Sequence, residues 1–172
     1  MSIRVRLCLP TDREFITALA TRLSEFELPE WRQADQIDHT NVSALINAMD
    51  ESEPDTAIFV AQDEAVGQLV GFVRLQTRMD YFSKEKHGYI SSLAVDESFE
   101  GKGIGRKLLD TAEIWAREKG YDRLTLHMFV ENDRARRIYE EQGFQQDIIQ
   151  YIKVIAPRHA GAGRAGVGEP HE

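Results

Sequence analysis

Cysteine is nearly absent from this chain. Cys8 is the single one among 172 residues, which excludes a disulfide within the chain. It lies in the apolar run 3–9, where a buried structural cysteine is a better interpretation than a reactive thiol. No apolar run approaches the ~18 residues of a membrane span, and no charged-then-apolar leader opens the sequence. We therefore expect a soluble protein of the reducing cytoplasm with no membrane partner.

Basic residues are also scarce. Lysine and arginine number 21 against 29 aspartates and glutamates, which gives a formal net charge of −8. Nucleic-acid binding requires a basic face, so DNA and RNA are excluded as partners. The stretch 25–55 contains Arg32 as its only base. Its acids are Glu25, Glu27, Glu30, Asp35, Asp38, Asp50, Glu51, Glu53 and Asp55. This stretch is either a solvated helical face or a surface that attracts a cation.

Hydrophobic periodicity predicts alternating strands and helices. The expected strands are 3–9, 57–62, 69–76, 89–95, a strand from Leu124 through Met128, and 144–155. The expected helices run from a capping-box sequence at 11–14 through Leu23, around 42–49, over 104–119, and from Asn132. One domain therefore covers residues 1–155. Residues 156–172 lack periodicity and are expected to form a flexible tail.

The most informative segment, from Tyr89 to Gly105, reads YISSLAVDESFEGKGIG. It joins a strand to a glycine loop that opens directly into an amphipathic helix. Backbone amides at a helix start lack internal partners and carry partial positive charge, which favours a bound phosphate. Glycines at 101, 103 and 105 let the main chain approach an anion closely. The segment predicts a phosphate-bearing cofactor beside the strand.

The spacing of the loop excludes two nucleotide-binding motifs. The dinucleotide fingerprint needs a third glycine where this chain has Arg106 or Leu108, and the Walker loop also fails at Arg106. What remains is ExxGxG followed by RKLL. This pattern resembles the pyrophosphate loop of the GCN5-related N-acetyltransferases (the GNAT family), with Glu100 in place of the usual Gln or Arg. The alternative is a glycine-rich turn that closes an ordinary strand–helix connection.

A second block supports the resemblance. Residues 124–144 read LTLHMFVENDRARRIYEEQGF, with Asn132 at a helix cap and Gly143 where the helix end favours a left-handed residue. The block is similar to the second GNAT motif, Asn-x-x-Ala-x-x-x-Tyr-x-x-x-Gly-Phe, at Asn132, Ala135, Tyr139, Gly143 and Phe144. The resemblance covers roughly residues 3–155. It implies an α/β (α+β) fold with a mixed, mostly antiparallel sheet and about four flanking helices.

The resemblance also implies acetyl-CoA as co-substrate, without a metal. The residues expected to contact acetyl-CoA are Leu93, Ala94, Val95, Gly101, Lys102, Gly103, Ile104, Gly105, Arg106, Asn132 and Tyr139. In the family, the strand before the loop splays from the next strand and exposes main-chain groups to the pantetheine arm. The Leu93 amide would hold the thioester oxygen, and the Tyr139 phenol would protonate the departing thiolate.

The general base is left open by the sequence. Many relatives have a carboxylate where this chain has Ser91 and Ser92, and neither serine is a base at neutral pH. The remaining candidates are Glu85, His87, His127 and Glu131. A water chain to solvent is the alternative, because a small fraction of an amine is already neutral.

The acceptor is suggested by charge. In the family, the first two helices form one wall of the acceptor site, and here that region contains the acidic stretch. It would attract a cationic amine, either a small molecule such as a polyamine or an aminoglycoside, or a peptide amine. A non-catalytic acyl-CoA-binding or regulatory module of the same fold is the alternative function. Relatives often have one more C-terminal strand, so either this sheet is shorter or a partner chain covers its edge in a homodimer.

Overall fold

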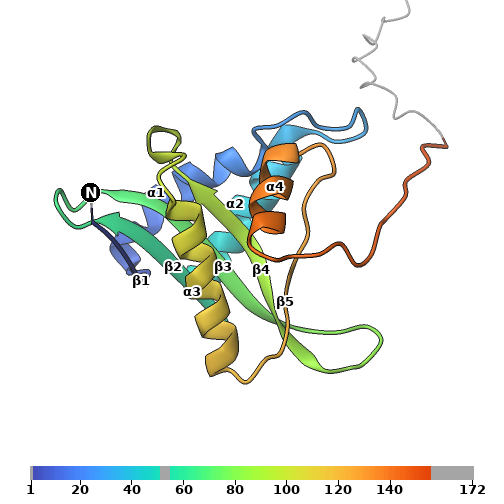
Figure 1. Ribbon diagram of the computed structural model, residues 1–172. Coiled ribbons are helices and arrows are strands. Elements are labelled where there is room, and N and C mark those ends of the chain that lie inside the picture. Colours follow the sequence, from blue (N-terminus) through green and yellow to red (C-terminus); the bar gives the residue numbers. More distant parts are fainter. Residues whose placement is uncertain (1, 51–54, 156–172) are drawn as a thin grey trace, which may run out of the picture.

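A five-stranded sheet forms the centre of the protein (Figure 1). The computed structural model describes residues 2–50 and 55–155. The strands, in the order in which they lie side by side, are β1 Ile3–Leu7, β2 Thr56–Asp63, β3 Leu69–Met79, β4 Lys86–Val95 and β5 Leu124–Leu126. Neighbours from β1 to β4 pair antiparallel, and β5 pairs parallel to β4. The predicted mixed, mostly antiparallel sheet is confirmed.

Helices cover both faces of this sheet (Figure 1). They are η1 Pro10–Asp12, α1 Arg13–Leu19, η2 Ala20–Ser24, α2 Ala34–Asp50, η3 Glu97–Phe99, α3 Ile104–Glu118 and α4 Asp133–Glu141. The prediction of a helix around 42–49 was too short, because the first turns of α2 are mostly polar and lack a clear apolar stripe. Within the described ranges, no helix has the length and apolarity needed to cross a membrane.

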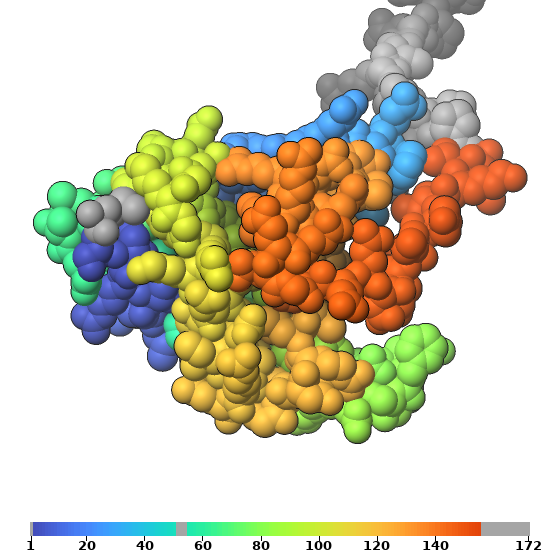
Figure 2. All heavy atoms as spheres, viewed as in Figure 1, coloured from blue at the N-terminus to red at the C-terminus, as the bar shows by residue number. Residues whose placement is uncertain are grey.

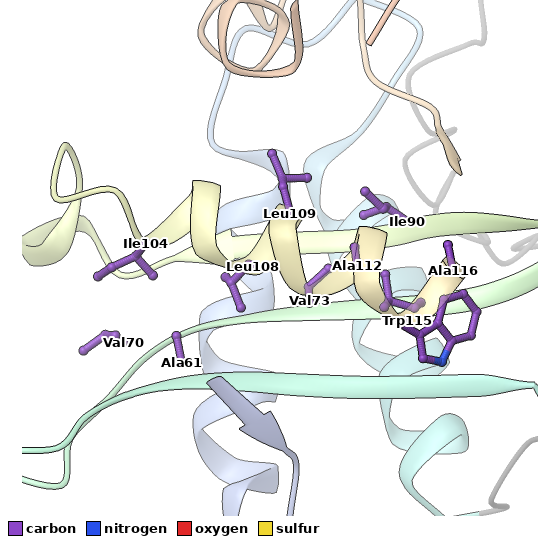
Figure 3. Packing of buried hydrophobic residues seen from close by; sticks show 11 residues of the cluster. Ala61, Val70, Val73, Ile90, Ile104, Leu108, Leu109, Ala112, Trp115 and Ala116 are labelled. Atoms are coloured by element: carbon purple, nitrogen blue, oxygen red, sulfur yellow. The ribbon is translucent and has the colours of Figure 1, made fainter. Parts of the chain in front are cut away.

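The face of the sheet beneath α3 holds the larger core (Figure 3). The apolar stripe predicted for this helix is buried there: Ile104, Leu108, Ala112 and Trp115. Gly71 of β3 permits the close approach of the helix. A Cβ at Gly71 would lie 2.9 Å from the Ala94 carbonyl oxygen and 3.3 Å from Leu108 Cδ1. The opposite face packs against α1 and α2 through a second core that includes Ile16, Leu45 and Phe72.

A bulge interrupts β4 opposite β3. Arg74 pairs with Ser92 and Leu75 pairs with Ile90, so Ser91 is the extra residue. A one-residue bulge reverses the alternation of the strand beyond it, and therefore also reverses which main-chain groups face each neighbour. The sequence pattern did not predict this feature.

The prediction of a strand over residues 144–155 is wrong. The described chain after α4 has no regular secondary structure, and the sheet ends at β5. The segment is rich in β-branched residues, yet Ile148 is 73% exposed, Tyr151 is 90% exposed and Ile155 is 92% exposed. Figure 2 shows it as the red spheres that extend beyond α4. The sheet of this chain therefore has five strands, and its edge at β5 carries no further strand from the described residues.

Candidate active site

The main-chain groups of Leu93 and Val95 face an opening beside β4. Asp96 N–H donates a hydrogen bond to the Val70 carbonyl oxygen of β3 at 2.9 Å. Alternation along an antiparallel strand then directs the N–H and C=O of Val95 and Leu93 away from β3. β5 does not extend far enough to pair with them, because its ladder with β4 ends at Ile90. The separation of these strands, expected from the resemblance, is therefore present.

The bulge at Ser91 determines which residues are exposed in this way. Before the bulge, Gly88 N–H donates toward β5, to the Arg123 carbonyl oxygen at 3.0 Å. In an unbroken strand the same alternation would turn residues 92 and 94 toward the opening. The extra residue shifts this role to Leu93 and Val95 instead. The Leu93 and Val95 side chains meanwhile pack against the core beneath α3.

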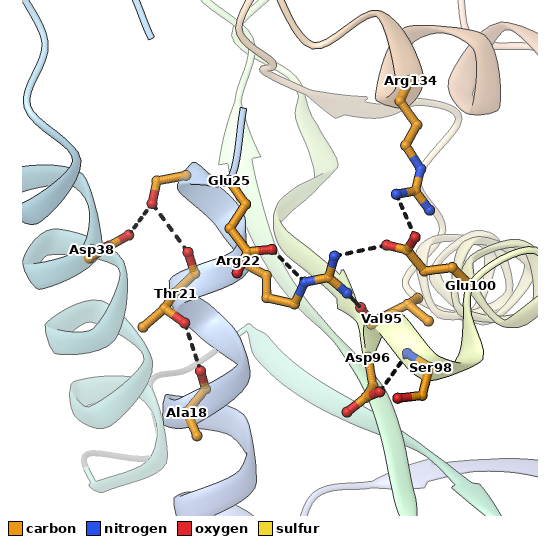
Figure 4. Close-up of polar contacts among 11 residues, drawn as sticks. Ala18, Thr21, Arg22, Glu25, Asp38, Val95, Asp96, Ser98, Glu100 and Arg134 are labelled. Atoms are coloured by element: carbon orange, nitrogen blue, oxygen red, sulfur yellow. Dashed lines mark hydrogen bonds and ion pairs between the residues drawn. The ribbon is translucent and has the colours of Figure 1, made fainter. Parts of the chain in front are cut away.

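Arg22 of η2 binds one of the exposed carbonyl groups (Figure 4). Its Nη1 donates to the Val95 oxygen at 2.7 Å. The same guanidinium donates through Nε to Glu25 at 2.7 Å and through Nη2 to Glu100 at 2.9 Å. Arg22 therefore connects the first helical region to both the end of β4 and the glycine loop. The N–H groups of Leu93 and Val95 remain directed at the opening.

The glycine loop contains two left-handed residues. Gly101 has φ of +70° and Gly103 has φ of +76°, a region that other residues seldom adopt. A Cβ at either position would meet no atom within 4 Å, so the space above the loop is open. α3 begins at Ile104 with its first amides unpaired within the helix. An open loop of this shape fits an anion such as pyrophosphate.

The two basic side chains of the loop differ in placement. Lys102 Nζ donates to the Ser98 carbonyl oxygen at 2.8 Å and lies 4.6 Å from the centroid of the Phe99 ring. Lys102 is therefore held against η3. Arg106 is exposed, and it makes no hydrogen bond or ion pair with any residue that the structure describes. Of the two, Arg106 is the side chain that is free to reach a ligand.

Glu100, which departs from the family pattern, joins two arginines. Its Oε1 accepts from Arg22, and its Oε2 lies 2.7 Å from Nη1 of Arg134 on α4. Burial on its own would raise the pKa of Glu100. The hydrogen bonds and charges of Arg134 and Arg22 outweigh burial, so its pKa lies below the ordinary value. The carboxylate is therefore ionised, and it places two guanidinium groups beside the loop (Figure 4).

The second motif supplies a capped helix and a half-buried phenol. Asn132 Oδ1 accepts from the Ala135 N–H at 3.0 Å, which confirms the predicted cap. Gly143 has φ of +85°, as predicted for the helix end. The Tyr139 and Phe144 rings pack with centroids 5.7 Å apart. Burial raises the pKa of Tyr139, which keeps the phenol protonated at neutral pH.

A cavity of about 670 Å³ brings several of these residues together. One wall comes from η2, the segment after it, and α2. The other wall comes from β4, β5, the segment after β5, and α4. Leu93, Asn132 and Tyr139 all line it, so the structure places these three predicted residues in one site. Its volume is typical of sites for small molecules.

His127 is the base candidate that lies at this cavity. Its Nδ1 is 3.3 Å from the hydroxyl of Tyr89. A proton on Nδ1, donated to the Tyr89 oxygen, leaves Nε2 as a proton acceptor. Ser91 and Ser92 also line the cavity but supply no base.

The other base candidates lie elsewhere. Glu85 pairs with Arg123 at 2.9 Å, while the buried His87 and the exposed Glu131 are not among the lining residues. Across residues 2–50 and 55–155, no three side chains of the metal-binding types gather as a ligand set.

The stretch 25–55 lines part of the cavity, but not through the acids that define it. None of its described carboxylates lines the cavity, whereas its single base, Arg32, does. Four of these carboxylates are held by other groups: Glu25 by Arg22, Asp38 by Ser24, Asp50 by Arg13, and Asp55 by Lys119. Glu51 and Glu53 lie outside the described residues. Among the residues that the structure describes, the acids of this stretch therefore place no negative charge in the cavity wall.

Comparison with known proteins agrees with the fold. The model of the acetyltransferase (GNAT) family matches residues 17–144. A mycothiol acetyltransferase of Propionibacterium freudenreichii subsp. shermanii is 36% identical over 119 residues, which is 68% of this chain and 37% of that protein. The chain therefore spans less than half the length of that relative.

Two further proteins match nearly end to end. Aminoglycoside N(6')-acetyltransferase type 1 of Stenotrophomonas maltophilia is 28% identical over 140 residues, covering 80% of this chain and 87% of that protein. The structure of aminoglycoside N-acetyltransferase AAC(6')-Iy with CoA has a TM-score of 0.67 at 20% identity, covering 88% of this chain and 95% of that one. The chain belongs to the GNAT family of acetyltransferases, which use acetyl-CoA, and the predicted family, fold and enzyme class are confirmed.

Proposed function

We propose that this acetyltransferase moves the acetyl group of acetyl-CoA directly to a primary amine in a ternary complex. The observation that carries the proposal is one cavity lined by both Leu93 and Tyr139. Leu93 offers a main-chain donor, and Tyr139 offers a protonated phenol. Both functions, within reach of one thioester, would lower the barrier to direct acyl transfer.

The residues on either side of the cavity fit the two ends of the co-substrate. The open, left-handed loop at Gly101 and Gly103, followed by the start of α3, suits the pyrophosphate. The N–H groups of Leu93 and Val95, together with the Leu93 carbonyl, suit the amide-containing pantetheine arm, which would extend β4 like a short strand. Asn132 uses its side-chain oxygen as a helix cap, so its amide nitrogen remains available to donate.

The chemistry divides among three groups of the chain. Acetyl-CoA, when bound, supplies an acetyl group activated as a thioester. The Leu93 N–H stabilises the negative charge that develops on the carbonyl oxygen, a contribution on the order of 3 kcal/mol for such donors. Nε2 of His127 accepts the proton of the attacking amine, directly or through water. The Tyr139 phenol donates a proton to the departing sulfur.

Small-molecule amines are the acceptors that the proposal favours. The cavity volume is suited to them, and the relatives named for mycothiol and aminoglycoside acetylation point the same way. The positive charge of a protonated amine would be lost before attack, since only the neutral amine is a nucleophile.

The test is amine-dependent release of free thiol from acetyl-CoA. The purified protein is incubated with acetyl-CoA and a broad panel of primary amines, and acetylated products are identified by mass spectrometry. We expect thiol and acetyl-amine to form in equal amounts. Binding of acetyl-CoA with no amine-dependent release across the panel would show a binding module instead of an enzyme.

A further inference from the structure

The charge of the cavity wall is opposite to that of the chain. The protein has a formal net charge of −8, yet none of the described residues that line the cavity is an aspartate or glutamate. The charged residues in the described wall are Arg22 and Arg32, alongside His127. A site built to hold a purely cationic acceptor would present carboxylates to it.

The two arginines differ in their partners. Arg22 is held by the carboxylates of Glu25 and Glu100, which offset its charge. No carboxylate among residues 2–50 and 55–155 lies within ion-pair distance of Arg32. Arg32 is therefore the cation of the described wall whose charge is not already neutralised.

Arg32 is held at the cavity by aromatic contacts. Its guanidinium carbon is 5.4 Å from the centroid of the Phe129 ring, and Phe129 packs against Phe26 with ring centroids 5.2 Å apart. The backbone is fixed by a turn in which Arg32 N–H donates to the Pro29 oxygen at 2.8 Å. Stacking of a guanidinium uses its face and leaves its N–H edge free for a planar carboxylate or a phosphate.

We propose that the acceptor is a primary amine that also carries an anionic group, a carboxylate or a phosphate, and that Arg32 binds this group. The inference rests on the proposed acetyl transfer and names the substrate class of that site.

The experiment compares amines in matched pairs that differ only in the anion. L-phenylalanine is paired with phenethylamine, and glucosamine 6-phosphate with glucosamine. The ratio of kcat/KM within each pair is measured for wild type, Arg32→Gln, Arg32→Lys and Arg4→Gln. Because each ratio is compared between variants, the intrinsic reactivity of each amine cancels. The exposed Arg4 of β1 is a matched control far from the cavity wall.

We expect wild type to favour the anion-bearing member of at least one pair, and the pair that responds identifies the anion as carboxylate or phosphate. Arg32→Gln should lower that ratio about ten- to a hundredfold, in line with loss of a charged hydrogen bond. Arg32→Lys should retain part of it, and Arg4→Gln should leave it unchanged.

Two other outcomes are distinguishable. Amine turnover with a ratio that Arg32→Gln does not change would overturn this inference but leave the proposed function standing. Absence of turnover with any amine, while acetyl-CoA still binds, would overturn both. Thermal unfolding of each variant checks that substitution of the exposed Arg32 or Arg4 leaves the protein folded.

Discussion

Arg134 Nη1 on α4 lies 2.7 Å from Glu100 Oε2 in the glycine loop. The ion pair spans the gap between the two GNAT motifs, and Arg22 reaches the same carboxylate from the opposite side. Glu100, which departs from the family pattern of the phosphate loop, therefore holds two arginines beside that loop. The same carboxylate also opposes a bound phosphate by its negative charge.

Substitution of Glu100 by glutamine should strengthen acetyl-CoA binding. Glu100→Gln removes a negative charge from the loop and frees Arg134 to face the phosphates, while Glu25 and the Val95 oxygen still hold Arg22. We expect a three- to tenfold lower Kd, or about 0.7–1.4 kcal/mol, with the gain shrinking as salt is raised. Titration calorimetry measures it, and Glu97→Gln in η3 is the nearby control. Weaker binding by Glu100→Gln would mean that the carboxylate is needed to position the two arginines.

Loss of the Tyr139 hydroxyl should slow the chemical step. Tyr139→Phe keeps the ring packing against Phe144 but removes the acid, so kcat should fall about a hundredfold or more. The affinity for acetyl-CoA should be retained. Tyr81→Phe, in the exposed turn between β3 and β4, is the control. Because burial raises the pKa of Tyr139, the wild-type rate should not decline up to about pH 9. Unchanged kcat in Tyr139→Phe would remove it from the mechanism.

The two loop glycines should differ in their tolerance of alanine. Gly103 has φ of +76° with open space above it, so Gly103→Ala costs about 1–2 kcal/mol through backbone strain alone. Gly105 is helical, and its added Cβ would make only an ordinary 3.9 Å contact with Val95 Cγ2. Gly105→Ala should therefore be neutral or stabilising by up to about 1 kcal/mol. Urea unfolding at equilibrium measures the free energy of unfolding of each variant. An equal loss of stability in Gly103→Ala and Gly105→Ala would contradict this explanation.

Removal of one buried carboxylate should destabilise the fold in a pH-dependent manner. Asp12 accepts two hydrogen bonds from Arg6 and one from the Leu9 N–H. The hydrogen bond from Arg6 is the main cause of its lowered pKa, and it acts against burial, which would raise the pKa. A lowered pKa contributes stability above the unfolded value near 3.9 and loses it as the pH falls through the folded value.

Asp12→Asn should therefore lower the free energy of unfolding by about 2 kcal/mol at pH 7. The deficit relative to wild type should shrink between about pH 5 and about pH 2. Urea titrations across this range measure it, with the exposed Asp110→Asn of α3 as control. A deficit that is independent of pH would show that packing, and not the charge of Asp12, is responsible.

Elements that depend on near neighbours in the sequence were predictable. The stripe of α3, the Asn132 cap and the left-handed Gly143 each depend on residues within about one or two helical turns. The motif resemblance singled out Leu93, Asn132 and Tyr139, and all three line one cavity.

Features that depend on distant partners were not predictable. Arg22 lies 78 residues before Glu100, and no local pattern connects them. The bulge at Ser91 is a property of the register between β3 and β4, which the sequence of one strand does not define. The segment 144–155 has strand-forming residues, but a strand also needs a partner edge, and β5 offers only Leu124–Leu126. Net charge along the stretch 25–55 likewise did not reveal that its single base, and none of its described acids, lines the cavity.

The short ladder between β4 and β5 has a consequence for the dynamics of the protein. β4 pairs with β3 from Val95 through Lys86, but with β5 only from Gly88 to Ile90. The segment that contains β5 and α4 can therefore detach from the edge of the sheet at a low cost in free energy. It would open as a cooperative unit distinct from the rest of the sheet. Its amide protons should exchange with solvent sooner than those at the centre of the sheet. A ligand that touches both Leu93 and Tyr139 would bridge the two units, so the co-substrate would complete the structure as well as enter the reaction.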